Sequence, residues 1–434
     1  MGDIFGVPLA IEGLMAFFLE GTFIGLFFFG WDRLSRRQHL IVTWLVAIGS
    51  NLSALWILIA NAWMQNPTGA HFNPDTMRME LDSLREVIFN PVAQSKFVHT
   101  VSAGYVTGAI FVLAISAWYL LKGRHIELAK RSATVALSFG LAASLSVVVL
   151  GDESGYTLTQ NQKMKIAAIE SEWHTELPPA AFTAFGIPDS ASHTTRARIQ
   201  VPGVLGLIAT RSTDQEVPGI FELVDLAKAR IASGIPAYSA LRVLRQDPAN
   251  AEARKVLTEH AADLGYALLL RKYVDDPGQA SARQIERAAW DTVPAVGPMF
   301  WTFRAMVALG LFFIGLFTVG FVLATRRRLM NSRTFLRIAF WALPLPWVAA
   351  ELGWIVAEYG RQPWAIAGIL PTFLAVSPIP VANVALSLTG FVVFYSLLAI
   401  IDVYLLHKYI RRGPDQPRSR EVGAVPSALS VGAS

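Results

Sequence analysis

Seven long apolar segments constrain the fold of this chain more than any other feature. They lie at about 9–31, 40–63, 97–121, 132–150, 299–325, 335–359 and 384–406. A helix needs about 20 consecutive apolar residues to cross the hydrocarbon core of a bilayer. Only 16% of the 434 residues are charged, whereas soluble domains carry roughly a quarter. The sequence therefore predicts an all-α fold, a multi-pass transmembrane helical bundle with about seven spans.

Basic residues set the expected orientation of these spans. Lys and Arg cluster in the connections after the first, third and fifth spans and after the seventh, whereas the connection 360–383 holds only Arg361. Short cytoplasmic connections carry an excess of Lys and Arg. The basic side is therefore predicted to be cytoplasmic, and the long connection 151–297 is predicted to face outward.

Four regions follow from this pattern. Residues 1–150 hold the first four predicted spans, and residues 298–410 hold the last three. The segment 151–297 has no spanning stretch and is too long for an ordinary connection, so we expect a loop domain with its own function. The Pro-, Ser- and Arg-rich segment 411–434 is predicted to be a disordered cytoplasmic tail.

The chain contains no cysteine, which excludes disulfides, thiolate-bound clusters and c-type haem attachment. His99 is the one histidine of eight that lies inside a predicted span. Haem–copper oxidases and bis-His dihaem cytochromes need more intramembrane histidines than this. His99 and Met306, at similar predicted depth, have the side chains to bind one low-spin haem. The alternative is that His99 is a hydrogen-bonded core residue and Met306 fills a packing gap.

Carboxylates in the apolar segments form a second set of candidates. Glu358 ends the sixth span, and Arg361 follows one helical turn later. The pair is either part of a functional site or a structural ion pair with Trp354 and Trp364 as interfacial anchors. Glu20 lies deep in the first span, eight residues beyond Glu12. It is either a proton-relay residue or a protonated residue that bonds to a neighbouring helix.

Each remaining polar candidate has a structural alternative to a functional role. Arg304 precedes Met306 by two residues and either meets a haem propionate or extends outward to the membrane surface. Ser53 supplies a hydroxyl at mid-membrane depth in the second span, together with Ser50 and Asn51. From their pattern alone, Lys163, Lys165 and Glu170 are expected on a solvated face of a short helix in the outer loop.

Long sequence motifs resemble subunit I of the cytochrome bd quinol oxidases. They cover nearly all of residues 2–413 and read GDIFGVPLAIEG (2–13), FFLE (17–20), WLVAIGSNLSALW (44–56), KFVHT (96–100), LGDESGY (150–156), FRAM (303–306) and GWIVAEYGRQPW (353–364). The resemblance implies a terminal oxidase of aerobic respiration that oxidises quinol at the outer face and reduces oxygen to water. It also implies a bacterial cytoplasmic (inner) membrane location, with the loop 151–297 facing the periplasm or the outside.

The resemblance also implies cofactors and partners. The expected cofactors are a low-spin haem b, a high-spin haem b and a haem d, with quinol as substrate. The expected partners are subunit II, an optional small single-span subunit, membrane quinol and oxygen, with no nucleic acid. The resemblance implies that His99 and Met306 ligate the low-spin haem, with Arg304 beside it. It implies that Glu358 ligates the high-spin haem, that Glu12 lies at haem d, and that Trp354 and Arg361 pack on this haem pair. It also implies that Glu20 and Ser53 belong to a proton path and that Lys165 and Glu170 bind quinol.

One departure from the family pattern leaves alternatives open. The family has two further spans before the position that matches Met1, and the first carries a haem-binding histidine. The sequence as given is therefore expected to lack part of the oxygen site. The alternatives are a truncated haem-binding electron-transfer subunit without oxygen-reducing activity, and a proton-coupled transporter that uses Glu12, Glu20 and Glu358.

Overall fold

The computed structural model describes residues 2–414, and these divide into two units. The first unit is Met1–Val376 and the second is Ser377–Ser434. Within the described part of the second unit, the long helix α16 (Val381–Arg412) is the main element. The predicted tail 411–434 falls mostly outside the described residues, which end at 414.

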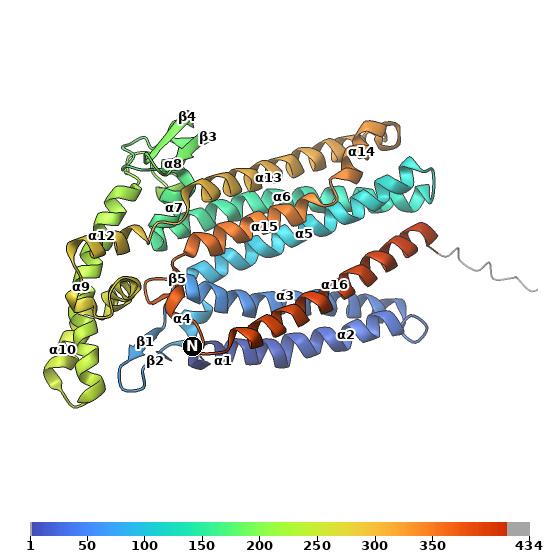
Figure 1. Cartoon of the computed structure of the whole chain (residues 1–434). Helices are drawn as coiled ribbons and strands as arrows, with labels where there is room; N and C mark the ends of the chain where they lie inside the picture. Colours follow the sequence, from blue (N-terminus) through green and yellow to red (C-terminus); the bar gives the residue numbers. More distant parts are fainter. Residues whose placement is uncertain (1, 415–434) are drawn as a thin grey trace, which may run out of the picture. The chain divides into compact units, whose positions relative to one another are not determined.

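Long helices dominate the first unit (Figure 1). Across residues 2–414, six helices are long and apolar enough to cross a membrane, and a bent pair adds a seventh. This confirms the predicted number of spans. The spanning elements are α1 (Gly2–Ile11) with α2 (Phe18–Phe29), α3 (Arg36–Gln65), α5 (Pro91–Leu121), α6 (Ile126–Asn161), α13 (Val296–Thr325), the pair α14 (Arg333–Trp341) and α15 (Leu345–Glu358), and α16.

Two of these spans depart from a straight helix. The sixth span was predicted as one helix over 335–359, but α14 and α15 meet at an angle of 42°. Pro344 and Pro346 lie at the bend, where a proline removes a backbone donor and clashes with the preceding turn. In the first span, a π-helical stretch, Glu12–Phe17, joins α1 to α2. Such local widening of a helix is frequent at functional sites.

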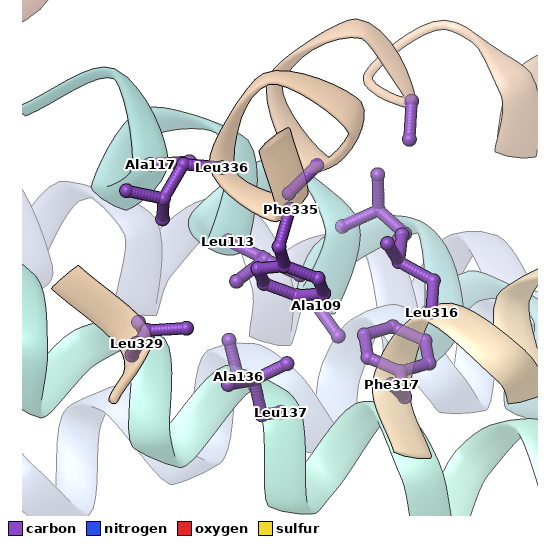
Figure 2. Close-up of a cluster of buried hydrophobic side chains, with 14 of the residues drawn as sticks. Ala109, Leu113, Ala117, Ala136, Leu137, Leu316, Phe317, Leu329, Phe335 and Leu336 are labelled. Atoms are coloured by element: carbon purple, nitrogen blue, oxygen red, sulfur yellow. The ribbon is translucent and has the colours of Figure 1, made fainter. Parts of the chain in front are cut away.

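The apolar core of the first unit lies where α5, α6, α13 and α14 pack together (Figure 2). Leu113, Leu137 and Phe317 are almost fully buried there. Gly140 lets the ring of Phe317 approach, because a Cβ on that glycine would lie 2.3 Å from the ring. Small residues bring membrane helices together in this way, since lipid supplies no hydrophobic force between them.

Residues 151–161 of the predicted loop continue α6, and the rest of the loop folds at one end of the long helices of this unit, which we call the loop end (Figure 1). Its helices pack around a buried apolar cluster that includes Ile169, Ile220 and Leu270. The elements are α7 (Lys163–Glu170), β3 (Phe182–Asp189), β4 (Thr194–Val201), α8 (Val204–Thr210), α9 (Ile220–Gln246), α10 (Ala251–His260), α11 (Leu264–Leu268) and α12 (Ala282–Trp290).

Three small antiparallel hairpins accompany the helices and were not predicted. They are β1 (Ala70–Asn73) with β2 (Arg78–Leu81), β3 with β4, and β5 (Trp364–Ile366) with β6 (Leu370–Pro371). Helix α4 (Leu84–Ile88) follows the first hairpin. Short 3-10 turns occupy Ala261–Asp263, Leu269–Lys272, Pro277–Gln279, Leu329–Asn331, Tyr359–Arg361 and Thr372–Leu374.

Candidate functional site

Glu358, at the loop end of α15, is the centre of a polar network. Its Oε2 accepts from Arg361 Nη2 at 2.7 Å, so the predicted ion pair is confirmed. Its Oε1 accepts from Asn61 Nδ2 at 3.0 Å and from Gln65 Nε2 at 3.3 Å. Lys96 Nζ lies 3.7 Å from the same oxygen and also donates to Asn61 Oδ1. The carboxylate is thus held by groups from α3, α5 and the turn after α15.

Lys165 of α7 reaches into this network from the loop. Its side chain is 2% exposed, and Nζ donates to Gln65 Oε1 and to the carbonyl of Ala357, both at 2.9 Å. Burial, followed by the nearby charge of Lys96, lowers the pKa of Lys165 well below its usual range, while Glu358 opposes the shift. The solvated face that the pattern predicted for Lys165 is therefore wrong. Its neighbour Lys163 is exposed, as expected.

The other end of α7 holds a buried ion pair. Glu170 Oε2 accepts from Arg304 Nη2 at 2.8 Å, and both side chains are under a tenth exposed. Arg304 also donates to the carbonyls of Ile169 at 2.7 Å and Thr183 at 2.9 Å. Burial raises the pKa of Glu170, and Arg304 opposes this rise. The expected solvated face is wrong for Glu170 too, and Arg304 does not extend to the membrane surface.

His99 on α5 and Met306 on α13 lie on opposite members of a ring of four helices, in which α5, α6, α13 and α15 contact one another in turn. Across α6, a Cβ on Gly151 would lie 3.2 Å from the His99 ring, and across α15 a Cβ on Gly353 would lie 3.1 Å from Met306 Sδ. Glycine at each position leaves the ring and the sulfur space that a side chain at that position would occupy.

These residues fit a haem group. His99 Nδ1 is buried without a hydrogen-bond partner among the described residues, and a Cβ added at Gly104 or Gly108 of α5 would meet nothing within 4 Å. The backbone of Val147 on α6 also hydrogen-bonds to the His99 imidazole, so the free position is Nδ1 alone. One free ring nitrogen, a thioether and an open helix face are what a planar macrocycle with His and Met ligands requires. At the Glu358 network, Arg361 Nε and Nη1 are also buried without partners, which suits an acidic group.

Glu12 and Glu20 of the first span each bind a serine of α3. Ser53 Oγ donates to Glu12 Oε1 at 2.8 Å, and Ser50 Oγ donates to Glu20 Oε1 at 2.9 Å. The bond from Glu20 to a neighbouring helix was one of its two predicted alternatives. Glu12 begins the π-helical stretch. Trp354 on α15 is half exposed, and Lys96 Nζ lies 5.3 Å from the centre of its ring.

Sequence reasoning missed four members of the site: Asn61, Gln65, Lys96 and Thr183. Asn61 and Gln65 carried a usable signal, because two amides four residues apart on an apolar helix share one face. Thr183 carried none, since its role comes from a carbonyl that meets Arg304 across 121 residues of sequence.

A cavity of about 420 Å³ lies where the loop meets the loop ends of α3 and α15. Its walls combine polar and aromatic groups, among them Gln65, Lys165, Tyr266, Arg361 and Trp364. Binding sites for small molecules typically occupy a few hundred Å³ and join apolar walls to a few directed polar groups. The cavity therefore has the size and chemistry to accept a ring with oxygen substituents.

Comparisons with known proteins agree with this geometry. Residues 1–414 match the family described as cytochrome bd terminal oxidase subunit I. The chain is 47% identical over 421 residues to cytochrome bd-II ubiquinol oxidase subunit 1 of Escherichia coli (strain K12), covering 97% of this chain and 82% of that one. It is 32% identical over 423 residues to cytochrome bd ubiquinol oxidase subunit 1 of Bacillus subtilis (strain 168), covering 97% and 78%.

A solved structure shares the fold. The bd oxidase from Geobacillus thermodenitrificans matches with a TM-score of 0.69 at 23% identity, over 95% of this chain and 79% of that one. At that identity the likeness concerns the fold alone. The family match and the two relatives carry the assignment: this chain belongs to the cytochrome bd terminal oxidase subunit I family.

Proposed function

We propose that this chain is the quinol-oxidising subunit of a bd-type terminal oxidase, a quinol:oxygen oxidoreductase of a respiratory chain. The observation that carries the proposal is the placement of α7. Its buried Lys165 bonds to Gln65, which also bonds to Glu358, and its buried Glu170 pairs with Arg304, two residues from Met306. One short helix of the loop thus meets both candidate haem sites.

The reaction at this end of the protein is the two-electron oxidation of quinol to quinone, which releases two protons. Glu170 is suited to accept one of them, because its raised pKa makes the protonated form accessible and Arg304 stabilises the carboxylate before transfer. Lys165 is suited to hold a quinol oxygen, since it is a buried hydrogen-bond donor on the wall of the 420 Å³ cavity. Burial keeps both side chains largely out of contact with water.

The family carries haem groups, which when bound accept and pass single electrons and reduce oxygen. We assign His99 and Met306 to a low-spin haem b, Glu358 to a high-spin haem b and Glu12 to haem d. Arg304, Trp354 and Arg361 would pack beside these groups. Glu20 and Ser53 would hold and move protons from the opposite end of the first and second spans, Glu20 through its hydrogen bond from Ser50 and Ser53 through its hydrogen bond to Glu12.

Subunit I of a bd oxidase acts with a partner subunit. We propose subunit II as that partner, with a small single-span subunit as an optional addition. The chain is a multi-pass membrane protein, and we propose the bacterial cytoplasmic membrane as its location, with residues 151–297 on the periplasmic side. No observation among the described residues favours the transporter or the incomplete electron-transfer subunit.

A Glu170→Gln variant of the assembled oxidase tests the quinol role. Glutamine keeps the shape of the side chain but cannot accept a proton as a carboxylate does. We expect slow haem reduction by quinol and normal reduction by dithionite, which bypasses the quinol site. Equal quinol-driven rates in the wild type and the variant would contradict the proposal. Absence of any haem band in the reduced-minus-oxidised spectrum of the wild type would instead support a transporter.

A further inference from the structure

Thr183, in the first residues of strand β3, connects two arginines that belong to different parts of the chain. Its carbonyl accepts from Arg304 Nε at 2.9 Å, and its hydroxyl accepts from Arg198 Nη2 at 3.2 Å. Thr183 is fully buried. The position of Arg304, and with it the position of Glu170, therefore depends on the β3–β4 hairpin.

Arg198 of β4 links this contact to a second buried carboxylate. Its Nη2 donates to Glu172 Oε1 at 2.6 Å, and Glu176 Oε2 lies 3.9 Å from the same nitrogen. The Glu172 side chain is 2% exposed, whereas Arg198 is 30% exposed and Glu176 25%. A continuous series of contacts thus runs from Glu172 through Arg198, Thr183 and Arg304 to Glu170.

Attachment of the hairpin does not depend on Arg198. Thr195 of β4 already bonds to Ser171 Oγ at 2.8 Å and to Trp173 Nε1 at 3.2 Å, beside the end of α7. A buried ion pair costs desolvation and is weak evidence for stability. Glu172 and Arg198 form a second buried pair, two residues from Glu170. Its role must be something other than holding the hairpin in place.

The explanation we favour is electrostatic. The charged groups that face Glu172 are Arg198 on β4, Glu176 after α7 and Arg304 on α13. Arg198 in turn lowers the pKa of Glu170. Burial raises the pKa of Glu172 to about 8, with Arg198 opposing and Glu176 adding to the rise. Glu172 therefore gains its negative charge at mildly alkaline pH, and below that range the charge of Arg198 acts on Glu170 without compensation.

We propose that Glu172 and Arg198 are positioning residues for quinol oxidation, which set the orientation of Arg304 and the charge environment of Glu170 through Thr183. The inference rests on the proposed role of Glu170 as the proton acceptor. It assigns the β3–β4 hairpin a part in the reaction, although none of its residues needs to touch quinol. Its signature is a change in the pH dependence of the reaction, which simple loss of a structural contact would not produce.

Glu172→Gln in the assembled oxidase tests this directly. Glutamine keeps an oxygen that accepts a hydrogen bond from Arg198. It is neutral at every pH, whereas Glu172 is neutral only below its pKa. We expect quinol-driven haem reduction by the variant to match the wild type near about pH 6 and to diverge from it above about pH 8, with KM for quinol unchanged. Each unit of change in the pKa of Glu170 alters its proton affinity about tenfold, which sets the scale of the divergence.

Three further variants keep the result decisive. Glu259→Gln changes an exposed carboxylate on α10 and should follow the wild type at all pH values. Arg198→Gln removes the shared donor and should slow quinol-driven reduction at every pH, and Arg198→Lys should restore part of the rate because it keeps the charge. Dithionite reduction and the haem spectrum report whether each variant is folded.

The outcomes separate this inference from the proposed function. Identical pH profiles for the wild type and Glu172→Gln, or a rate loss that is the same at all pH values, would overturn it, provided that Glu170→Gln slows the quinol reaction. Full activity of Arg198→Gln would also overturn it. If Glu170→Gln itself left the quinol reaction unchanged, the proposed quinol role would fail first.

Discussion

Lys165 and Glu358 share a single hydrogen-bonding partner, although they are 193 positions apart in the sequence. Gln65 Oε1 accepts from Lys165 Nζ at 2.9 Å, while Gln65 Nε2 donates to Glu358 Oε1 at 3.3 Å. The amide suits this place because it offers an acceptor to the lysine and a donor to the carboxylate at once. Gln65 of α3 therefore couples the loop to the Glu358 carboxylate, in addition to the direct bond from Lys165 to the carbonyl of Ala357 on α15.

Replacing Gln65 by leucine should break this coupling. Lys165 would lose an acceptor and Glu358 a donor in a buried site, which costs about 1–3 kcal/mol for each unsatisfied group. We expect a lower thermal midpoint and a higher KM for quinol in the assembled oxidase. Gln200→Leu, at an exposed position of β4, is the control and should change neither value. A Gln65→Leu variant with wild-type KM would show that the coupling has no role in quinol binding.

The two lysines of α7 provide a matched pair. Both side chains line the cavity, but Lys165 is buried and donates to Gln65 and Ala357, whereas Lys163 is exposed. Lys165→Met keeps the length of the side chain and removes the donor, so quinol-driven haem reduction should slow by about tenfold or more, as expected for a lost buried hydrogen bond to substrate. Lys163→Met should retain the wild-type rate. Stopped-flow reduction by quinol measures both, and the opposite order of effects would be incompatible with the assignment.

Two methionines of α13 test the proposed ligand of the low-spin haem. Met306→Leu keeps the volume of the side chain but removes the sulfur, so the haem that it ligates should become high-spin or be lost. Met299→Leu changes a fully buried methionine with no proposed ligand role and should leave the spectrum unchanged. Optical and electron paramagnetic resonance spectra of the two variants decide the matter. A low-spin signal that survives in Met306→Leu would remove this residue from the ligand set.

Local spacing explains which parts of the site were predictable. The pairing of Glu358 with Arg361 follows from positions three apart at the end of a helix, and the spans follow from the length of their apolar runs. Each of these patterns lies within one segment of sequence. Because the residues involved are close in sequence, the sequence alone is enough to predict these features, and the structure confirms them.

Long-range contacts explain what sequence reasoning got wrong or missed. The sequence pattern predicted that Lys165 and Glu170 lie on a solvated face of α7. Nothing within α7 indicates that Gln65, Ala357 and Arg304 cover this face. The partner of Glu170 lies 134 residues away. The β3–β4 hairpin was missed although residues 196–201 alternate polar and apolar side chains, because the β3 segment has no such alternation and the structure shows register shifts between the strands. The roles of the proposed haem ligands and quinol residues came from family resemblance rather than from spacing.

The raised pKa of Glu172 also predicts how stability depends on pH. A carboxyl group that binds its proton more tightly in the folded chain than in the unfolded chain favours folding while it stays protonated. Its ordinary pKa is 4.5 and its folded value is about 8, so this contribution is fully present below about pH 4.5. It is lost as the pH rises through 8, because the folded state must then carry a buried charge that the unfolded state carries in water. Glu172→Gln has no proton to lose.

We therefore expect the thermal midpoint of the solubilised wild-type oxidase to fall between about pH 5 and pH 8 more steeply than that of Glu172→Gln. The Glu259→Gln variant, which changes an exposed carboxylate, should show the wild-type slope. Parallel pH dependences for the wild type and Glu172→Gln would mean that Arg198 holds Glu172 ionised throughout this range. In that case the carboxylate and Arg198 form a permanent ion pair, and the pH dependence of the loop must arise from another group.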